Sequence, residues 1–405
     1  MKYEKLRDDL NRTLAAPDLE PETVIEACHA LSQEISAGTY DRLLQRALSR
    51  GGNETAKEQV ADQVRQAARL LSRPRLEEKL RWELPPVPEG VYRCPLGVLL
   101  HIGAGNMEGL PAYSVVEGLL AGNINLLKLP EGDNSISSFL LRRLVTIEPR
   151  LRPYVYVFRI PSSERGPMKC LAGLADGIAV WGGDEAVRAV RELAGPGVKL
   201  IEWGHRISFA YVTTRGMDEQ RLRQLARHML STGQVLCSSC QGIYLDTDDW
   251  KKLEKFSEHF LEILEEEARN CPAKDQGERG RNTLRVQCSR LEAAAYGGKR
   301  VFAGALTSVT LEEDPCPETS LMFGNCWVKS LPREEILPVL RRNSGYLQTV
   351  ALLCGEDERE ALARLLWRAG AARVCGAGEM SALPDKGVQP HDGEFPLMRY
   401  SKYVT

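Results

Sequence analysis

The chain has 405 residues, of which 43% are hydrophobic and 27% charged, the composition of a soluble globular protein long enough for two domains. Its formal charge of −2 gives no electrostatic reason to expect binding to nucleic acid or to an anionic membrane. No stretch approaches the roughly 18 apolar residues of a membrane span, and the N-terminus lacks a signal-peptide pattern. The 11 cysteines show no framework spacing, so we expect a cytoplasmic protein with reduced thiols. From the charge and the absence of a long apolar run, we expect no nucleic-acid partner and no membrane insertion.

Residues 1–82 are polar and follow a helical pattern, with one helix opening near Pro21 and another predicted over Glu54–Leu80. They carry no recognisable chemistry, so we expect a helical layer that covers one side of a larger fold. A proline-rich connector, Glu83–Gly90, follows.

The next part of the chain alternates short apolar runs with helical segments. The predicted strands are Gly97–Ile102, Leu126–Leu129, Tyr154–Phe158, Gly177–Trp181 and Lys199–Ile201. The predicted helices are Pro111–Leu120, Ser135–Val145, Pro167–Leu174 and Glu185–Leu193. Almost continuously apolar strands that alternate with helices predict a parallel sheet covered on both faces. Ligands bind beyond the carboxyl ends of such strands. Asn106, Lys128, Gly182 and Glu202 lie at or just past predicted strand ends.

The segment Ser231–Gly242 is the strongest candidate for a reactive site. It follows a predicted amphipathic helix over Met217–Leu230, with Asp218 as its N-cap, and precedes a short buried strand at Gly242–Leu245. Cys237 is therefore predicted on a turn, where its thiolate can act as a nucleophile. A cysteine packed as a small apolar residue is the alternative.

The remainder of the chain carries less chemistry. A long amphipathic helix is predicted over Asp248–Asn270, then a polar loop over Cys271–Asn282, and a loop-rich tail that contains His391–Gly393. The C-x-x-C pair that begins at Cys237 also suits zinc or a redox thiol pair. Zinc needs about four ligands, and no second Cys or His pair has a matching spacing, so we expect no metal site.

Six motifs occur in the order found in the aldehyde dehydrogenase superfamily. They are Pro95–Val98, Asn106, Gly122–Pro130, Gly182–Gly183, Glu202–Gly204 and Gly233–Cys237. Within that superfamily, the Cys-Ser-Ser-x-Gln run at 237–241 and the ending Pro390–Gly393 resemble the LuxC-like fatty acyl-CoA reductases of bioluminescence operons. The resemblance covers roughly residues 91–400.

This resemblance implies an α/β fold of aldehyde dehydrogenase type, with two doubly wound parallel-sheet domains and an N-terminal helical layer. It places the helical region and the dinucleotide-binding domain at residues 1–205 and the catalytic domain at 206–385. Residues 386–405 would form a C-terminal tail that returns to the first domain or contacts another subunit.

The catalytic residues of the family have counterparts in this sequence. Cys237 matches the nucleophile that becomes acylated, and Asn106 matches the side-chain amide that forms the oxyanion hole with the Cys237 backbone N–H. Glu202 matches the general base of the aldehyde-oxidising members. A reductase transfers hydride to the acyl-enzyme instead of hydrolysing it.

The cofactor-binding residues are matched less completely. Lys128 corresponds to the lysine that binds the adenosine ribose, and Gly182 and Gly183 correspond to the turn against the cofactor phosphates. Phe323 belongs to the Phe-Gly pair near the nicotinamide ribose, although the glutamate that usually precedes it is replaced by leucine. Glu131 would accept from a ribose 2′-hydroxyl and repel a 2′-phosphate, whereas the relatives use NADPH.

We therefore expect an enzyme that reduces an acyl-CoA, or another acyl thioester, to an aldehyde through an acyl-cysteine intermediate. The expected cofactor is NADPH, with NADH also possible. An aldehyde dehydrogenase that forms the acid, and a cysteine acyltransferase or thioesterase without redox chemistry, remain alternatives. The expected partners are a small-molecule acyl thioester, other copies of the chain in a dimer or tetramer, and an acyl-transfer protein.

Overall fold

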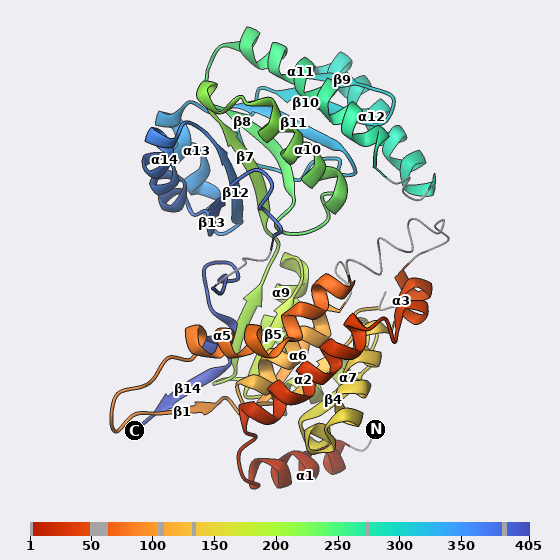
Figure 1. Cartoon of the computed structure of the whole chain (residues 1–405), viewed down its shortest axis with the longest axis vertical. Coiled ribbons are helices and arrows are strands. Elements are labelled where there is room, and N and C mark those ends of the chain that lie inside the picture. The colour runs from red at the N-terminus through yellow and green to blue at the C-terminus, as the bar shows by residue number, and fades with distance from the viewer. Residues whose placement is uncertain are drawn as a thin grey trace. The chain divides into compact units, whose positions relative to one another are not determined.

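The computed structural model describes residues 3–48, 64–103, 105, 109–131, 135–271, 276–382 and 387–405. The chain divides into two compact units, one formed by Met1–Gly204 with Pro384–Thr405 and the other by His205–Leu383. Each unit is built on its own parallel or largely parallel sheet with helices packed against it (Figure 1). The predicted α/β fold class is confirmed.

The first unit contains a five-stranded sheet in which every pairing is parallel. Its strands are β2 (Val98–Ile102), β3 (Ile124–Lys128), β4 (Val155–Phe158), β5 (Gly177–Trp181) and β6 (Lys199–Trp203). Their order is β4-β3-β2-β5-β6, so the winding direction reverses between β2 and β5. In sheets of this kind, ligands bind outside the carboxyl ends of the strands at such a reversal.

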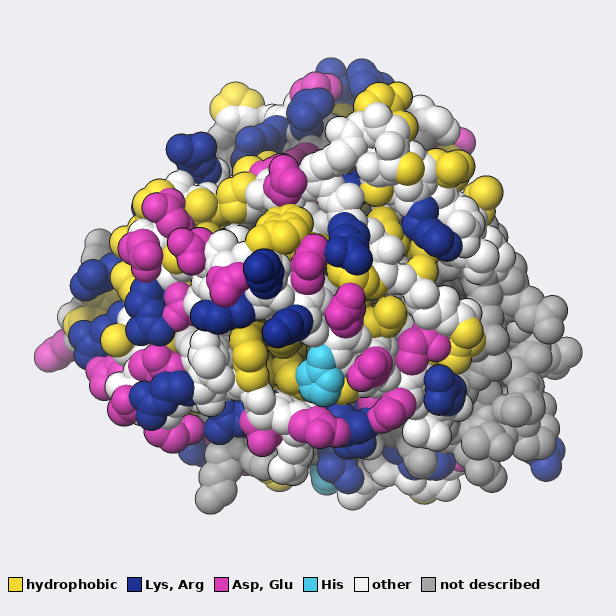
Figure 2. Space-filling model, turned by 90° about the horizontal axis from the view of Figure 1, so that it is seen from above, with side chains coloured by type: hydrophobic (Ala, Val, Ile, Leu, Met, Phe, Trp, Pro, Cys, Tyr) yellow, Lys and Arg dark blue, Asp and Glu magenta, His cyan; other side chains and the backbone are white. Residues whose placement is uncertain are grey.

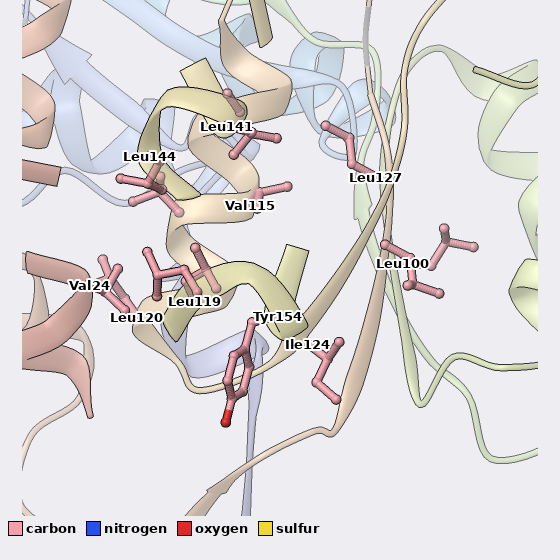
Figure 3. Close-up of a cluster of buried hydrophobic side chains, with 14 of the residues drawn as sticks. Val24, Leu100, Val115, Leu119, Leu120, Ile124, Leu127, Leu141, Leu144 and Tyr154 are labelled. Carbon is pink, nitrogen blue, oxygen red and sulfur yellow. The ribbon is translucent and has the colours of Figure 1, made fainter. Parts of the chain in front are cut away.

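The helices between these strands agree with the predicted ones to within about two residues. They are α6 (Leu110–Leu120), α7 (Ile136–Ile147), α8 (Arg165–Ala172) and α9 (Asp184–Leu193), with the 3-10 turn η2 (Pro149–Tyr154) before β4. Figure 3 shows the core that α6 and α7 build against the sheet. It includes Leu100, Ile124 and Leu127 from the strands and Val115, Leu119, Leu120, Leu141 and Leu144 from the helices.

The N-terminal residues form the expected helical layer. Its elements are α1 (Tyr3–Leu14), α2 (Pro21–Ser36), α3 (Asp41–Leu48), η1 (Arg69–Leu71) and α5 (Arg73–Glu83). Val24 of α2 packs into the same core as α6 and α7 (Figure 3). The single helix predicted over Glu54–Leu80 is wrong at Ser72, which is extended. Pro74 lacks an amide hydrogen and is tolerated only in a first turn, so a new helix begins there. Residues 49–63 lie outside the described part of the chain.

The C-terminal residues are built into the first unit. Strand β14 (Ser401–Val404) pairs antiparallel with β1 (Tyr92–Pro95), and α15 (Pro396–Arg399) contacts α5 and α6. Tyr400 is fully buried, and its carbonyl accepts a hydrogen bond of 2.9 Å from Asn123 Nδ2. The tail therefore closes this unit with backbone and side-chain bonds.

The second unit contains a seven-stranded sheet of order β13-β12-β7-β8-β11-β10-β9. Its strands are β7 (Ile207–Val212), β8 (Cys240–Leu245), β9 (Lys299–Ala303), β10 (Ser308–Glu312), β11 (Asn325–Ser330), β12 (Leu347–Leu353) and β13 (Arg373–Cys375). Only the edge strand β9 runs antiparallel to its neighbour. Its helical elements are η3 (Thr214–Gly216), α10 (Glu219–Thr232), α11 (Trp250–Arg269), α12 (Gln276–Tyr296), η4 (Arg333–Glu335), α13 (Ile336–Leu340), η5 (Arg341–Asn343) and α14 (Glu356–Ala369).

Two local predictions in this unit have opposite outcomes. Asp218 is the N-cap of α10, and its carboxylate accepts from the Arg221 N–H at 3.0 Å, as predicted. The polar loop predicted over Cys271–Asn282 is wrong, because α12 already begins at Gln276. The inner side of α12 is partly polar, with Asn282 and Ser289 buried, so the sequence lacks the continuous apolar stripe from which a helix is predicted.

The surface carries charges of both signs. Figure 2 shows Lys and Arg intermingled with Asp and Glu over the visible face. Within the described residues, no helix combines the length and apolarity needed to cross a membrane.

Candidate active site

Predicted cofactor residues and the predicted catalytic Glu202 lie at the carboxyl edge of the sheet in the first unit. Lys128 is the last residue of β3, Gly182 and Gly183 follow β5, and Glu202 is near the end of β6. The parallel register pairs Lys128 with Ile102 and Glu202 with Val180. The fold thus brings together residues that are far apart in the sequence, at the edge where the winding reverses.

Asn106, the predicted oxyanion-hole residue, lies outside the described residues. It falls in the chain segment that leaves β2 and leads to α6. Its role remains a prediction from the sequence.

Lys128 and Glu131 meet through a residue that the sequence analysis did not identify. Lys128 is almost fully buried, and its Nζ donates to Ser162 Oγ at 3.2 Å, while the Ser162 backbone N–H donates to Glu131 Oε1 at 2.7 Å. Burial lowers the pKa of Lys128, which the Glu131 carboxylate partly offsets. The backbone hydrogen bond from Ser162 lowers the pKa of Glu131. Ser162 therefore links a lysine and a carboxylate, a combination that suits the binding of sugar hydroxyls.

The two glycines after β5 occupy different environments. Gly183 is the N-cap of α9, and a Cβ placed on it would meet no atom within 4 Å, so its backbone is accessible to a ligand. A Cβ on Gly182 would lie 3.0 Å from the Ala186 Cβ, a close helix–strand approach. Asp184 and Glu185 occupy the first turn of α9, where they stabilise the helix but would repel a phosphate.

Glu202 is held in a bidentate ion pair. Arg191 of α9 donates from Nε to Oε1 at 2.5 Å and from Nη2 to Oε2 at 2.6 Å. This pair raises the pKa of Arg191. Both carboxylate oxygens of the predicted general base are therefore engaged by a cation.

In the second unit, Cys237 lies in the middle of a tight turn at the amino end of β8. The Ser239 N–H donates to the Leu236 carbonyl at 2.9 Å, and the Leu236 N–H donates to Ser239 Oγ at 3.1 Å. The Cys237 carbonyl accepts 2.7 Å from Ser208 Oγ, which ties the turn to β7. The Cys237 side chain is only partly buried. The turn therefore presents a thiol on a firmly bonded backbone.

Two buried glutamines join this turn to the loop that holds Phe323. The Gln234 side chain donates to the Asn325 carbonyl at 3.0 Å and accepts from the Gly324 N–H at 2.9 Å. Phe323 itself donates its N–H to the Gly233 carbonyl at 3.2 Å. Met322, Phe323 and Gly324 all have positive φ, a backbone that needs such external bonds to persist. The structure thus places the predicted nucleophile turn and the predicted nicotinamide loop side by side.

Gln241 completes this arrangement, although the sequence predicted no role for it. Its Nε2 donates to the Gln234 carbonyl at 2.8 Å, and its Oε1 accepts from the Ser320 N–H and Oγ at 3.1 and 2.9 Å. We call the Gln234, Gln241 and Ser320 set the glutamine clamp. The sequence signal for this set was one glutamine on each side of Cys237, because long polar side chains next to a buried strand require hydrogen-bond partners.

His228 lies close to the turn but does not carry a charge there. Burial lowers its pKa to about 4, and its Nε2 is 3.4 Å from the Cys240 N–H, which donates to it. A neutral imidazole of this kind caps the strand end. Across the described residues, no cluster of three or more His, Cys, Asp or Glu side chains is suited to a metal ion.

Comparison with known proteins identifies the family. The model of a family described as acyl-CoA reductase (LuxC) matches residues 16–403. The long-chain acyl-protein thioester reductase of Photorhabdus laumondii is 24% identical over 333 residues, which are 80% of this chain and 66% of the relative. The enzyme of that name from Vibrio harveyi is 21% identical over 330 residues, 79% of this chain and 66% of the relative. The matched part thus spans slightly less than two thirds of these relatives.

Solved structures support the fold. The NADP-dependent glyceraldehyde-3-phosphate dehydrogenase from Bacillus halodurans C-125, complexed with NADP, has a TM-score of 0.71 at 15% identity, over 99% of this chain and 89% of that chain. A putative aldehyde dehydrogenase from Burkholderia cenocepacia has a TM-score of 0.73 at 16% identity, over 99% and 90%. The chain therefore has the aldehyde dehydrogenase fold and belongs to the acyl-CoA reductase (LuxC) family.

Proposed function

We propose that this protein reduces an acyl thioester to an aldehyde, with Cys237 as the residue that carries the acyl group. The observation that carries the proposal is the position of Cys237, a partly exposed thiol in the middle of a turn whose backbone is bonded on both sides. Membership of the acyl-CoA reductase family supports the same assignment.

In the proposed reaction, the Cys237 thiolate attacks the thioester carbonyl, and the donor leaves as a thiolate that takes a proton from solvent. The acyl group is then bound to Cys237 as a new thioester, so no oxidation or reduction has occurred. A reduced nicotinamide dinucleotide, when bound, supplies the hydride. Cys237 next holds a thiohemiacetal, which collapses to the aldehyde and regenerates the thiolate. By family resemblance, the Cys237 backbone N–H and Asn106 would stabilise the oxyanion.

The cofactor would be held by the carboxyl edge of the first sheet. Lys128 and Glu131 would bind the adenosine ribose, and Gly182 and the open backbone at Gly183 would lie near the phosphates. The role of Phe323 at the nicotinamide rests on the family resemblance alone. These residues fit a dinucleotide because they combine sugar-binding polar groups with an accessible glycine at a winding reversal. A carboxylate at the ribose disfavours a 2′-phosphate, so we propose that NADH is accepted alongside NADPH.

The ion pair at Glu202 favours reduction over oxidation to an acid. An aldehyde dehydrogenase must hydrolyse its acyl-enzyme with a water activated by this carboxylate. Here both oxygens of Glu202 are bonded to Arg191, at 2.5 and 2.6 Å. Without a carboxylate free to activate water, hydrolysis of the acyl-cysteine is slow, so hydride transfer can occur first.

Two kinds of thioester are candidates for the acyl donor. The family description specifies acyl-CoA, and the names of the relatives specify a long-chain acyl-protein thioester. We propose that the chain accepts an acyl-CoA, and that an acylated partner protein is a second donor. A homo-oligomer and a cytoplasmic location are further proposals.

A direct assay tests this function. Purified protein is mixed with NADPH or NADH and acyl-CoA of increasing chain length, and both dinucleotide oxidation and aldehyde are measured. Equal amounts of aldehyde and oxidised dinucleotide are expected, and none with Cys237→Ala. Release of fatty acid without dinucleotide consumption would instead identify a thioesterase. Formation of acid from added aldehyde would identify an aldehyde dehydrogenase.

A further inference from the structure

A short hairpin in the C-terminal tail presents His391 to the sheet of the first unit. His391 and Glu394 exchange backbone hydrogen bonds of 2.8 and 2.9 Å, and the two residues between them, Asp392 and Gly393, have φ values of 50° and 83°. Positive φ at both central residues is the requirement of a type I′ turn, for which Asp-Gly is a preferred sequence. The turn therefore fixes the direction of the imidazole.

The imidazole packs against two tryptophans that also contact each other. The centroid of the His391 ring is 4.9 Å from that of Trp181 and 4.9 Å from that of Trp203, and the tryptophan centroids are 5.5 Å apart. Trp181 and Trp203 are only 8% and 3% exposed. The three rings form a compact group, which we call the His391 cluster.

The tryptophans of this cluster end the two strands that carry proposed site residues. Trp181 is the last residue of β5 and is followed by Gly182 and Gly183, whereas Trp203 is the last residue of β6 and follows Glu202. Trp181 and Trp203 are register partners in the parallel pair β5–β6. The two rings therefore belong to the strand ends from which the proposed dinucleotide site is built.

The tail is attached to β6 by bonds that do not involve His391. Arg399 Nη2 donates to the Leu200 carbonyl at 3.1 Å, and Lys199 Nζ donates to the Ser401 carbonyl at 3.1 Å. The loss of the imidazole should therefore leave the tail in place. His391 can consequently be tested separately from the tail as a whole.

We propose that His391 is a positioning residue of the dinucleotide site, whose ring, packed against Trp181 and Trp203, fixes the carboxyl ends of β5 and β6. This inference rests on the proposed function and adds a residue from the opposite end of the chain to the proposed cofactor site. His391 acts through the two tryptophans, by packing. A phenylalanine at this position preserves a packed ring, and an alanine removes it.

The test compares His391→Ala, His391→Phe and a control, Tyr403→Ala, which changes an exposed residue of the same tail. Dissociation constants for NADPH and NADH are measured by fluorescence energy transfer from tryptophan, together with KM and kcat. His391→Ala should raise Kd and KM for the dinucleotide about 10-fold with kcat changed less than about 3-fold. His391→Phe and the control should remain within about 2-fold of the unchanged protein. Acrylamide should quench the tryptophan emission of His391→Ala more strongly.

The outcomes separate this inference from the proposed function. If the unchanged protein binds neither dinucleotide, the proposed function fails and this inference fails with it. If it binds them and His391→Ala binds equally well, only the inference fails, whatever happens to the melting temperature. If His391→Phe is folded but binds as weakly as His391→Ala, ring packing is not the cause and the inference is equally overturned.

Discussion

Cys237 and Cys240 are separated by two residues but differ in the properties that decide the reactivity of a thiol. Cys237 is partly exposed on its turn, whereas Cys240 is fully buried at the start of β8. The Cys240 thiol donates to the Gly242 carbonyl at 3.3 Å, and burial raises its pKa well above the ordinary value. Because the thiolate is the nucleophile, the environment favours Cys237.

This contrast predicts the behaviour of two matched variants. Cys237→Ala should abolish covalent labelling by a radiolabelled acyl-CoA, and Cys240→Ala should retain labelling while losing some stability through its cavity. Mass spectrometry of the labelled peptide locates the acyl group. Label on Cys240, or label that persists in Cys237→Ala, would contradict the assignment. Mild oxidation tests whether Cys237 and Cys240 form a disulfide. If they do, oxidation should inactivate the protein, dithiothreitol should restore activity, and this reversible loss should be absent in Cys240→Ala.

Glu131 supplies the second prediction at the scale of a residue. Its carboxylate lies at the proposed ribose site, linked to Lys128 through Ser162. Glu131→Ser should raise the ratio of kcat/KM for NADPH to that for NADH by about 10-fold or more, because a like charge is removed from the 2′-phosphate. Glu164→Ser changes an exposed carboxylate in the loop between β4 and α8, which also contains Ser162, and serves as the control. An unchanged ratio would mean that Glu131 does not face the ribose.

At the scale of elements, the glutamine clamp connects two loops that no regular structure joins. Ser320 is 86 residues from Gln234 and 79 from Gln241, yet it bonds to both side chains. The loop that it begins contains two consecutive non-glycine residues with positive φ, Met322 and Phe323. Such a backbone is retained only when its surroundings hold it. The clamp thus stabilises the strained loop and the cysteine turn together.

The clamp predicts a combined loss of stability and activity. Gln241→Ala would leave the Ser320 N–H and the Gln234 carbonyl without their partner, at a cost of about 1–3 kcal/mol in the free energy of unfolding. We expect kcat to fall as well, because the hydrogen bonds that hold the cysteine turn in place against the Phe323 loop are lost. Urea denaturation and steady-state assays measure both effects. Gln287→Ala, on the exposed side of α12, is the control, and equal stability of the two variants would count against the clamp.

At the scale of the whole molecule, each unit buries one neutral histidine. In the first unit, His101 Nε2 is 2.9 Å from Asn125 Oδ1 and its Nδ1 is 2.8 Å from Ser114 Oγ. In the second, His228 Nε2 accepts from the Cys240 N–H. Burial lowers the pKa of each histidine to about 4. Each unit therefore contains a buried imidazole whose protonation would destabilise the folded state.

These histidines predict an acid-sensitive fold. Between about pH 6.5 and pH 4 the unfolded chain binds protons that the folded chain excludes, so the stabilisation is complete above pH 6.5 and is lost as the pH falls. At pH 5 the expected loss is about 2 kcal/mol for each histidine. Denaturation at pH 7 and pH 5 should show a smaller loss in His228→Gln than in the unchanged protein. His259→Gln, which changes an exposed histidine, should behave like the unchanged protein; an equal slope for all three would refute the prediction.

The sequence alone determined the features that depend on local patterns. Apolar runs that alternate with helical segments define β2 to β6 and the helices between them, since each element requires only its own periodicity. The Asp218 cap follows from a side chain that bonds three residues away. The order of the motifs identified the family before any geometry was known. The predicted roles of Asn106, Glu202 and the cofactor residues remain predictions.

Only the tertiary structure decided the contacts between distant residues. The pairing of β1 with β14, the glutamine clamp and the packing of His391 against Trp181 and Trp203 join parts of the chain that no local pattern relates. The first residues of helix α12 were predicted as loop because the inner side of the helix is partly polar, so its packing rather than its periodicity defines it. In each case a side chain of ordinary local character acquires its role from a partner far along the chain. That partner is selected by sheet register and loop closure, which are properties of the assembled fold.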